Sequence, residues 1–174
     1  PTTGKALPTA TKLALAPTAS AVALHGHTTF ALSTQGEVHG WTGNNQYGLP
    51  GYYYPLTYKT AASPKVPILD KVVLLAGGQW HMCALQAKGI VSCWGSNNYG
   101  ESQPAWKFSQ TPRPATVHGV TDVVRIGCGR EHCCAVRAEG SLACWGTNWY
   151  GEFGNGAFNQ QPSLVVPVPG TTPQ

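Results

Sequence analysis

The sequence predicts an all-β protein built from three tandem four-stranded antiparallel blades of a β-propeller, either as a partial propeller or as a subunit that completes a ring. Three observations predict this fold. Glycine and proline are abundant and spread along the 174 residues, with 21 Gly and 14 Pro, which suits short strands joined by tight turns. A sequence repeat recurs with a period near 50 residues, and cysteines occupy matching positions in two of the repeats.

The repeat is clearest around three tryptophans, Trp41, Trp94 and Trp145. From Trp94 the chain reads Trp-Gly-Ser-Asn-Asn-Tyr-Gly, and from Trp145 it reads Trp-Gly-Thr-Asn-Trp-Tyr-Gly. A short apolar strand precedes each tryptophan, and a strand rich in proline and valine ends each unit. These closing strands are expected at 64–68, 112–117 and 162–168. Several short strands within such a period are typical of a propeller blade.

Glycines set the register of one hairpin in each unit. Three-residue turns end at Gly36, Gly89 and Gly140, where a residue in the left-handed region is needed and glycine adopts it without steric cost. This register places Cys83 opposite Cys93 and Cys134 opposite Cys144, within reach of a disulfide.

In the first unit the same two positions hold Phe30 and Gly40, an aromatic residue covering a cross-strand glycine. Cys128 and Cys133 then remain as a third pair. A metal site at Cys128, Cys133, Cys134 and His132 is the alternative, but the spacing is not a paired Cys-x-x-Cys, and disulfides are favoured. Full pairing of six cysteines implies an oxidising compartment, so we expect a protein that is secreted or at the cell surface.

The repeats resemble those of the regulator of chromosome condensation family. The resemblance rests on an Ala-x-Gly-x-x-His segment, an Ala-Leu pair, a glycine turn, the Trp-Gly-x-Asn-x-Tyr-Gly motif and a proline-rich end, best matched at 76–100 and 127–151. It implies four-stranded blades around a central axis. The family includes a nuclear nucleotide-exchange factor, and the repeats are also similar to those of a secreted bacterial inhibitor of β-lactamases. Both act by binding, but a shared fold does not transfer an activity.

Three repeats are too few to close a ring, so blade faces are expected to be left bare. The units are expected at about 20–69, 70–120 and 121–170, with a tail at 171–174. The segment 1–19 is predicted to be extended, with a possible ring-closing strand at 12–16; a disordered linker is the alternative. Apolar strands such as 72–75 and 165–168 are expected at the bare faces, which favours self-association or a longer parent chain.

The recurring side chains are predicted to be structural. Tryptophan and tyrosine of the Trp motif should pack between blades, and Asn44, Asn97 and Asn148 should hold the turn backbone. His81 and His132 occupy equivalent positions, and so do Glu101 and Glu152. No arrangement typical of a catalytic site is visible among only seven acidic residues, so neither an enzyme nor a cofactor is predicted.

Aromatic residues that do not recur are the candidates for binding. They are expected in rim loops, where Tyr and Trp offer rigid contact area with a polar tip; cover for gaps between blades, or burial in a subunit interface, is the alternative. The candidates are Tyr52, Tyr53, Tyr54, Tyr58, Trp80, Trp106, Phe108, Trp149, Phe153 and Phe158.

Composition narrows the class of partner. The net charge is +4 and the basic residues are scattered, whereas binding to duplex nucleic acid needs clustered phosphate contacts. No stretch of about 20 apolar residues is present to span a membrane. The sequence therefore predicts a secreted, non-enzymatic interaction module that binds protein partners, including copies of itself. A carbohydrate-binding module, with Trp and Tyr stacking on sugars, is the alternative.

Overall fold

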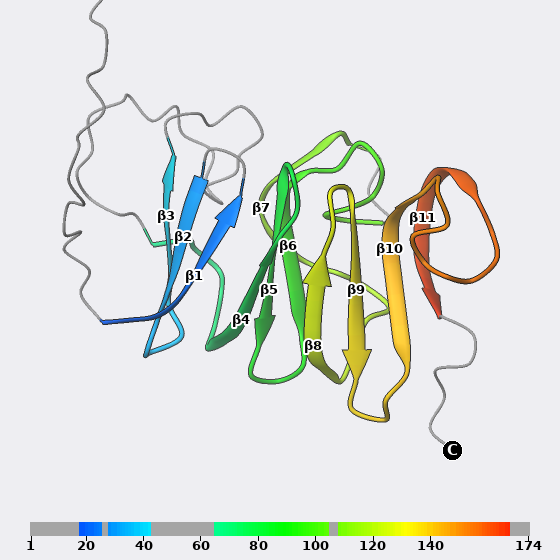
Figure 1. Cartoon of the computed structure of the whole chain (residues 1–174). Helices are drawn as coiled ribbons and strands as arrows, with labels where there is room; N and C mark the ends of the chain where they lie inside the picture. The colour runs from blue at the N-terminus through cyan, green and yellow to red at the C-terminus, as the bar shows by residue number, and fades with distance from the viewer. Residues whose placement is uncertain (1–17, 26–27, 43–64, 105–107, 168–174) are drawn as a thin grey trace, which may run out of the picture.

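A computed structural model describes residues 18–25, 28–42, 65–104 and 108–167. These residues form eleven strands in three antiparallel sheets that follow one another like the blades of a fan (Figure 1). The described part of the chain contains no helix. The predicted all-β architecture of propeller blades is confirmed.

Each sheet keeps the order of the sequence. The first consists of β1 (Ala19–His25), β2 (Thr28–Ser33) and β3 (Val38–Thr42). The second consists of β4 (Val72–Gly77), β5 (His81–Gln86), β6 (Val91–Ser96) and β7 (Gln110–Thr116). The third consists of β8 (Val123–Cys128), β9 (His132–Arg137), β10 (Leu142–Asn148) and β11 (Asn159–Pro167). We call these sheets blades 1, 2 and 3.

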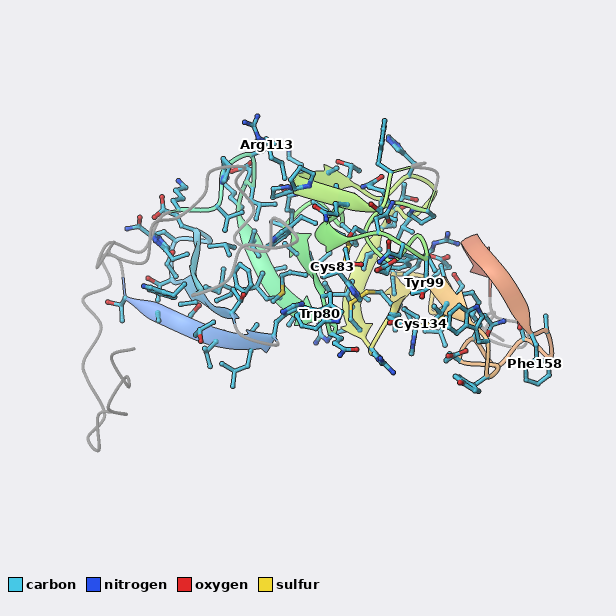
Figure 2. The ribbon with its side chains drawn as sticks, turned by 90° about the horizontal axis from the view of Figure 1, so that it is seen from above. Trp80, Cys83, Tyr99, Arg113, Cys134 and Phe158 are labelled. Carbon is cyan, nitrogen blue, oxygen red and sulfur yellow. A yellow bond between two sulfur atoms is a disulfide. The ribbon has the colours of Figure 1, made fainter. Side chains whose placement is uncertain are left out.

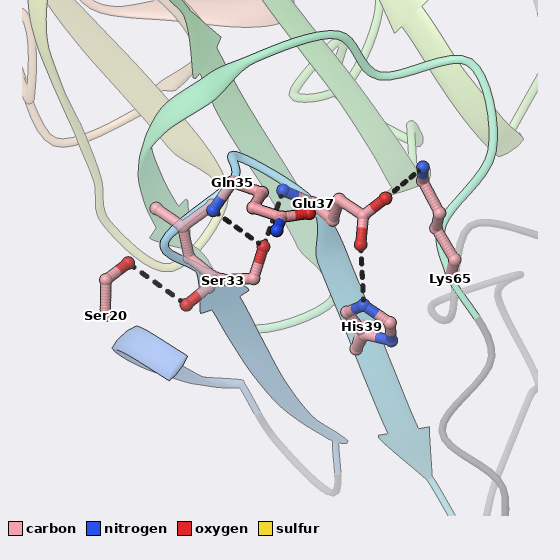
Figure 3. A network of polar contacts seen from close by, with 7 residues as sticks. Ser20, Ser33, Gln35, Glu37, His39 and Lys65 are labelled. Carbon is pink, nitrogen blue, oxygen red and sulfur yellow. Dashed lines mark hydrogen bonds and ion pairs between the residues drawn. The ribbon is translucent and has the colours of Figure 1, made fainter. Parts of the chain in front are cut away.

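Blade 1 shows its fourth strand only as an isolated bridge between His39 and Lys65, where a closing strand was predicted. The amide of Val66 also donates to the carbonyl of Val38, at 2.7 Å. In Figure 3 the Glu37 carboxylate accepts a 2.6 Å hydrogen bond from Lys65 Nζ and lies 3.7 Å from His39 Nε2. The Lys65 hydrogen bond is the main reason that the pKa of Glu37 lies below its usual value. These contacts attach the returning chain to blade 1.

The predicted hairpin register is confirmed in all three blades. Gly36, Gly89 and Gly140 have φ angles of 79°, 73° and 89°, the left-handed conformation that the turns require. Consequently Cys83 pairs with Cys93, Cys134 with Cys144 and Phe30 with Gly40 across their strands.

The structure contains three disulfides: Cys83–Cys93, Cys134–Cys144 and Cys128–Cys133. The first two lie on the face of their blade that points away from the preceding blade. Cys133 is next to Cys134 on β9, and successive strand residues point to opposite faces. The third disulfide therefore lies on the face of blade 3 that meets blade 2.

The core lies between the blades, in two clusters. Trp94 projects from blade 2 into the cluster shared with blade 1, where its ring meets that of Phe30 edge to face with centroids 5.7 Å apart. Trp145 projects from blade 3 into the cluster shared with blade 2 and donates from Nε1 to the carbonyl of Glu101, at 3.0 Å. Both tryptophans are fully buried, as the repeat predicts. Blades 2 and 3 thus each pack their tryptophan against the preceding blade.

Trp41, the corresponding residue of blade 1, was predicted to pack in the same way but is only half-buried. The described residues contain no blade ahead of blade 1 to receive it. Val22 behaves likewise: it pairs with Ala31 as Leu75 pairs with Ala84 and Ile126 with Ala135. Leu75 and Ile126 pack against the clusters, whereas Val22 is 65% exposed.

The apolar strand 72–75 does not form a bare outer face, so that expectation was wrong. It belongs to the middle blade, where Leu74 packs toward blade 3 and Leu75 toward blade 1. The exposed apolar side chains of blade 1 are Val22 and Leu24, at 65% and 72%. The sequence could not distinguish these strands, because both are apolar and only their position in the stack differs. The expected strand at 12–16 lies outside the described residues.

Candidate interaction surface

The turns that follow the Trp motifs form one rim of the blades. Asn97 anchors the turn of blade 2: its side-chain oxygen accepts from the amides of Ser102 and Gln103, at 3.1 and 2.7 Å. Asn148 anchors the turn of blade 3 by accepting from the amide of Phe153, at 2.9 Å. The predicted role of these two asparagines is confirmed, and Asn44 lies outside the described residues.

Glu101 and Glu152 hold the same turns. The Glu101 carboxylate is buried and accepts from Ser96 Oγ at 2.6 Å and from the amide of Tyr99 at 2.7 Å. Burial raises its pKa above the usual glutamate value, although these hydrogen bonds oppose the shift. Glu152 accepts from the amide of Tyr150 at 2.9 Å. The repeated geometry indicates a structural role for both carboxylates.

Aromatic side chains gather on this rim at the turns of blades 2 and 3. Tyr99, from blade 2, meets Trp149 of blade 3 edge to face, with ring centroids 4.7 Å apart. Tyr150 is 85% exposed, and Phe158 is 71% exposed. A Cβ built on Gly151 would lie 3.2 Å from the Phe158 ring, so Phe158 packs over this turn. We call Trp149, Tyr150 and Phe158 the aromatic turn of blade 3.

Tyr150 departs from its predicted role. It was expected to pack between blades, as Tyr99 does against Trp149 of the next blade. Blade 3 has no following blade among the described residues. Tyr150 is therefore left with its ring in solvent, at a position where its counterpart Tyr99 makes an aromatic contact.

The other candidate residues divide into three groups. Phe153 is only 2% exposed, so its prediction as a binding residue is wrong: the turn closed by Asn148 folds its ring inward. Trp80 is half-buried, and Figure 2 shows it well separated from Phe158. Phe108 is exposed on the same rim, and its carbonyl accepts from Asn97. Tyr52, Tyr53, Tyr54, Tyr58 and Trp106 lie outside the described residues.

A buried polar cluster that the sequence did not predict lies between blades 2 and 3. His81 Nε2 is 3.0 Å from Cys133 Sγ, and Cys83 Sγ is 3.6 Å from the same sulfur. Burial, together with smaller contributions from repulsion by His25 and His132, lowers the pKa of His81 to about 3. Its imidazole is therefore neutral near pH 7. One feature of the sequence could have indicated this cluster: Cys133 and Cys134 are adjacent on β9, so their sulfur atoms lie on opposite faces of the strand.

The opposite rim carries a shallow pocket of about 500 Å³. It is lined by the hairpin turn of blade 2, including Lys88 and Ile90, and by the linker to blade 3, including His118 and Asp122. The polar side chains that line it, including those of Lys88, His118 and Asp122, are exposed to solvent, so the pocket does not define a site for a particular ligand. Among the described residues, no helix is long and apolar enough to cross a membrane.

Stacked antiparallel blades that insert a repeated tryptophan into one another define a β-propeller repeat protein. The Regulator of chromosome condensation (RCC1) repeat matches residues 72–101 and 123–152, the strands and Trp motifs of blades 2 and 3. These two matches, together with 31% identity to a yeast relative over 78% of the chain, place the chain in the RCC1-type repeat propeller family.

Similar proteins share the repeats and the fold. The guanine nucleotide exchange factor SRM1 of Saccharomyces cerevisiae is 31% identical over 143 residues, which cover 78% of this chain and 29% of SRM1. The human probable E3 ubiquitin-protein ligase HERC3 is 30% identical over 147 residues, 81% of this chain and 14% of HERC3. The chain thus spans less than a third of the length of these relatives.

Solved structures agree on the fold. Yeast RCC1 (Prp20), in a crystal structure with Kap60, superposes with a TM-score of 0.74 at 20% identity over 86% of this chain and 37% of that one. Human WBSCR16 superposes with a TM-score of 0.67 at 23% identity, over 84% of this chain and 37% of that one. At these identities the likeness shows the propeller fold alone.

Proposed function

We propose that this chain is a non-enzymatic protein-interaction module that binds through the aromatic turn of blade 3 and through its uncovered blade faces. The observation that carries the proposal is the difference between Tyr99 and Tyr150. The first ring is packed against Trp149, whereas the second is 85% exposed at the equivalent position. A protein segment that presents an aromatic or aliphatic side chain would give Tyr150 the contact that Trp149 gives Tyr99.

Exposed tyrosine and tryptophan support protein binding for a physical reason. Such side chains bury a large area at a small cost in conformational entropy, and they are enriched where interfaces gain most of their free energy. Among the relatives, SRM1 is a guanine nucleotide exchange factor, and Prp20p was studied for binding to Gsp1p and histones. A propeller that binds proteins is therefore known in this family. The net charge of +4 disfavours basic partners such as histones for this chain.

The proposal is tested by comparing Tyr150→Ala with Tyr99→Ala. Proteins bound by the immobilised chain in an extract of its source cells are identified by mass spectrometry, and the affinity of each purified protein is then measured. Tyr150→Ala should weaken binding at least tenfold while leaving the melting temperature unchanged. Tyr99→Ala, the matched control, should lower the melting temperature because it removes a packed contact. Unchanged affinity of every bound protein for Tyr150→Ala would contradict the proposal.

The same variants test the carbohydrate alternative. A glycan array should give no signal above background with the intact chain. Binding of a defined glycan that is lost in Tyr150→Ala would instead favour a lectin-like module, with Trp149 and Tyr150 stacking on a sugar.

Self-association is proposed as part of this function, because blade 1 exposes two large aliphatic side chains, Val22 and Leu24. Val22 and Leu24 occupy positions that, in blades 2 and 3, face the preceding blade. Light scattering at micromolar concentration should show more than one chain per particle. The double variant Val22→Asp/Leu24→Asp should be a monomer. The control Lys88→Asp, which changes the charge of an exposed hairpin turn in blade 2, should associate as the intact chain does. A monomeric intact chain would contradict self-association.

We further propose that the chain works in an oxidising compartment, at the cell surface or outside the cell. The support is that all six cysteines are paired, with no free cysteine, and such disulfides persist in oxidising surroundings. Labelling of the protein isolated from its source with a thiol-reactive reagent, without reduction, should modify no cysteine. Labelling of Cys83 and Cys93 would contradict this location.

A further inference from the structure

We propose that the junction between blades 2 and 3 becomes a zinc site when its two disulfides are reduced, with His81, Cys83, Cys128 and Cys133 as the ligands. His81 and Cys83 lie on β5 of blade 2, and Cys128 and Cys133 lie on β8 and β9 of blade 3. One ligand atom from each residue lies within 4.8 Å of all the others. This inference does not depend on the proposed protein partner, and it concerns the reduced chain, which the proposed oxidising compartment would not contain.

The distances fit a tetrahedral ion. With Zn–S bonds of about 2.3 Å and a Zn–N bond of about 2.0 Å, two ligand atoms of a tetrahedral site lie about 3.5–3.8 Å apart. Cys83 Sγ and Cys133 Sγ are already 3.6 Å apart, although no bond joins them. His81 Nε2 is 3.0 Å from Cys133 Sγ. His81 Nε2 must therefore move about 0.5 Å away from Cys133 Sγ, and Cys128 Sγ must move farther, because its disulfide partner Cys133 Sγ lies at 2.07 Å.

The surroundings of the cluster also fit a structural metal. His81, Cys83 and Cys133 are fully buried, and Leu85, Val91 and Trp145 belong to the same junction. Three cysteines and one histidine form a common closed zinc site that leaves no position for water. The other imidazole nitrogen of His81, Nδ1, is buried without a hydrogen-bond partner, so no competing contact in the structure fixes this ring away from an ion.

Formation of the zinc site requires a reductant that cleaves the two disulfides, and a phosphine is such a reductant. Two equivalents of phosphine and two of water convert Cys83–Cys93 and Cys128–Cys133 into four thiols and two equivalents of phosphine oxide. When Zn²⁺ binds, Cys83, Cys128 and Cys133 each release one proton to the buffer, and neutral His81 supplies the fourth ligand. The resulting centre carries one negative charge, and Cys93 remains a thiol.

The two states differ in what they connect. Each disulfide joins two strands within one blade, so none of them crosses a junction. The zinc ion would join blade 2 to blade 3 through four bonds. In a reducing compartment the ion would therefore replace two local crosslinks with one between the blades.

Cobalt is the probe, because tetrahedral cobalt–thiolate centres absorb visible light. The full chain is reduced with a phosphine under argon and titrated with Co²⁺, and Zn²⁺ is then added. We expect one equivalent of Co²⁺ to bind with tetrahedral absorption and to be displaced by one equivalent of Zn²⁺. The unreduced chain should show neither change. Zn²⁺ should also raise the melting temperature of the reduced chain but not of the disulfide-bonded one.

Matched variants locate the site. Cys83→Ser and Cys133→Ser should each abolish stoichiometric binding, and Cys93→Ser should preserve it. The double variant Cys134→Ser/Cys144→Ser removes the equivalent disulfide of blade 3 and should also preserve binding. The proposal is overturned if the reduced chain binds no Co²⁺, if it stays unfolded with Zn²⁺ present, or if binding survives in Cys83→Ser and Cys133→Ser.

Discussion

The two junctions between blades are built on the same strand positions but filled with different chemistry. At the junction of blades 1 and 2, Phe30 covers Gly40 and its ring meets Trp94. At the junction of blades 2 and 3, the disulfide Cys83–Cys93 takes the place of Phe30 and Gly40, and Trp145 takes the place of Trp94. The repeat thus specifies which positions meet, and the residues at those positions decide whether the contact is an aromatic pair or a sulfur cluster.

The second junction also contains polar contacts between its two blades. Trp145 donates to the carbonyl of Glu101, and the turns of blades 2 and 3 are joined by the amide of Gln79, which donates to the carbonyl of Arg130 at 2.8 Å. Arg130 also donates from Nε to the side-chain oxygen of Gln79. Such contacts fix the angle between blades 2 and 3 as well as their spacing.

The largest expected effect comes from removing either tryptophan. Trp94→Ala and Trp145→Ala should each lower the free energy of unfolding by about 3–5 kcal/mol, because each leaves a cavity in a packed cluster. In Trp145→Ala about 1 kcal/mol of this loss should come from the Glu101 carbonyl, which loses its buried donor. Urea denaturation without reductant measures both. Half-buried Trp41 provides the comparison, and a loss for Trp41→Ala as large as for Trp94→Ala would show that blade 1 is covered.

The next effect separates the two equivalent disulfides. Cys83→Ala/Cys93→Ala and Cys134→Ala/Cys144→Ala open loops of the same length, with a sequence separation of 10 in each pair, so the loss from loop entropy should be about 2–3 kcal/mol in both. The first pair lies inside a junction and the second faces away from blade 2. We therefore expect about 1–2 kcal/mol more for the first pair, as the cost of its cavity. Equal melting temperatures for the two variants would contradict this difference.

The sequence predicted the fold and the register of these junctions because both depend on local signals. The turn at Gly89 aligns Cys83 with Cys93, and the repeat transfers the same alignment to blade 3 without any knowledge of distant contacts. The aromatic turn was predicted less well. Phe153 and Phe158 stand in the same turn and look alike in the sequence, yet Asn148 draws the first inward.

The sulfur cluster and the exposure of Tyr150 depend on which blade follows which. Tyr150 repeats the position of Tyr99, but Tyr99 contacts Trp149 of the next blade, whereas no blade that follows blade 3 is among the described residues. The proximity of His81 to Cys133 joins residues of two different blades, which a repeat alignment within one blade does not reveal. Contacts of this kind follow from the stacking of blades and not from local turn chemistry.

A smaller effect should appear as a pH dependence of the second junction. In the disulfide-bonded chain His81 has a pKa of about 3, below the value near 6.5 of an unfolded histidine. Unfolding therefore takes up a proton below pH 6.5, and stability is lost as the pH falls from about 6.5 toward 3. The loss at pH 5 should be about 2 kcal/mol relative to pH 8. His81→Gln should flatten this part of the profile, and an unchanged profile in that variant would assign the dependence to other groups.

The smallest effect is expected on the face of blade 1 that points away from blade 2. Val22 stands in the repeat where Leu75 stands in blade 2, but it is 65% exposed. Leu75→Ala should cost about 1–2 kcal/mol because that side chain is partly buried against the first junction. Val22→Ala in the monomeric chain should cost less than about 0.5 kcal/mol, as is usual for exposed positions. Measured again at concentrations where the chain associates, or in a longer chain that supplies a preceding blade, the cost at Val22 should rise toward that at Leu75. If Val22→Ala and Leu75→Ala lower the free energy of unfolding equally in the dilute monomer, the Val22 side chain is covered by another part of the chain, and this face of blade 1 is not exposed.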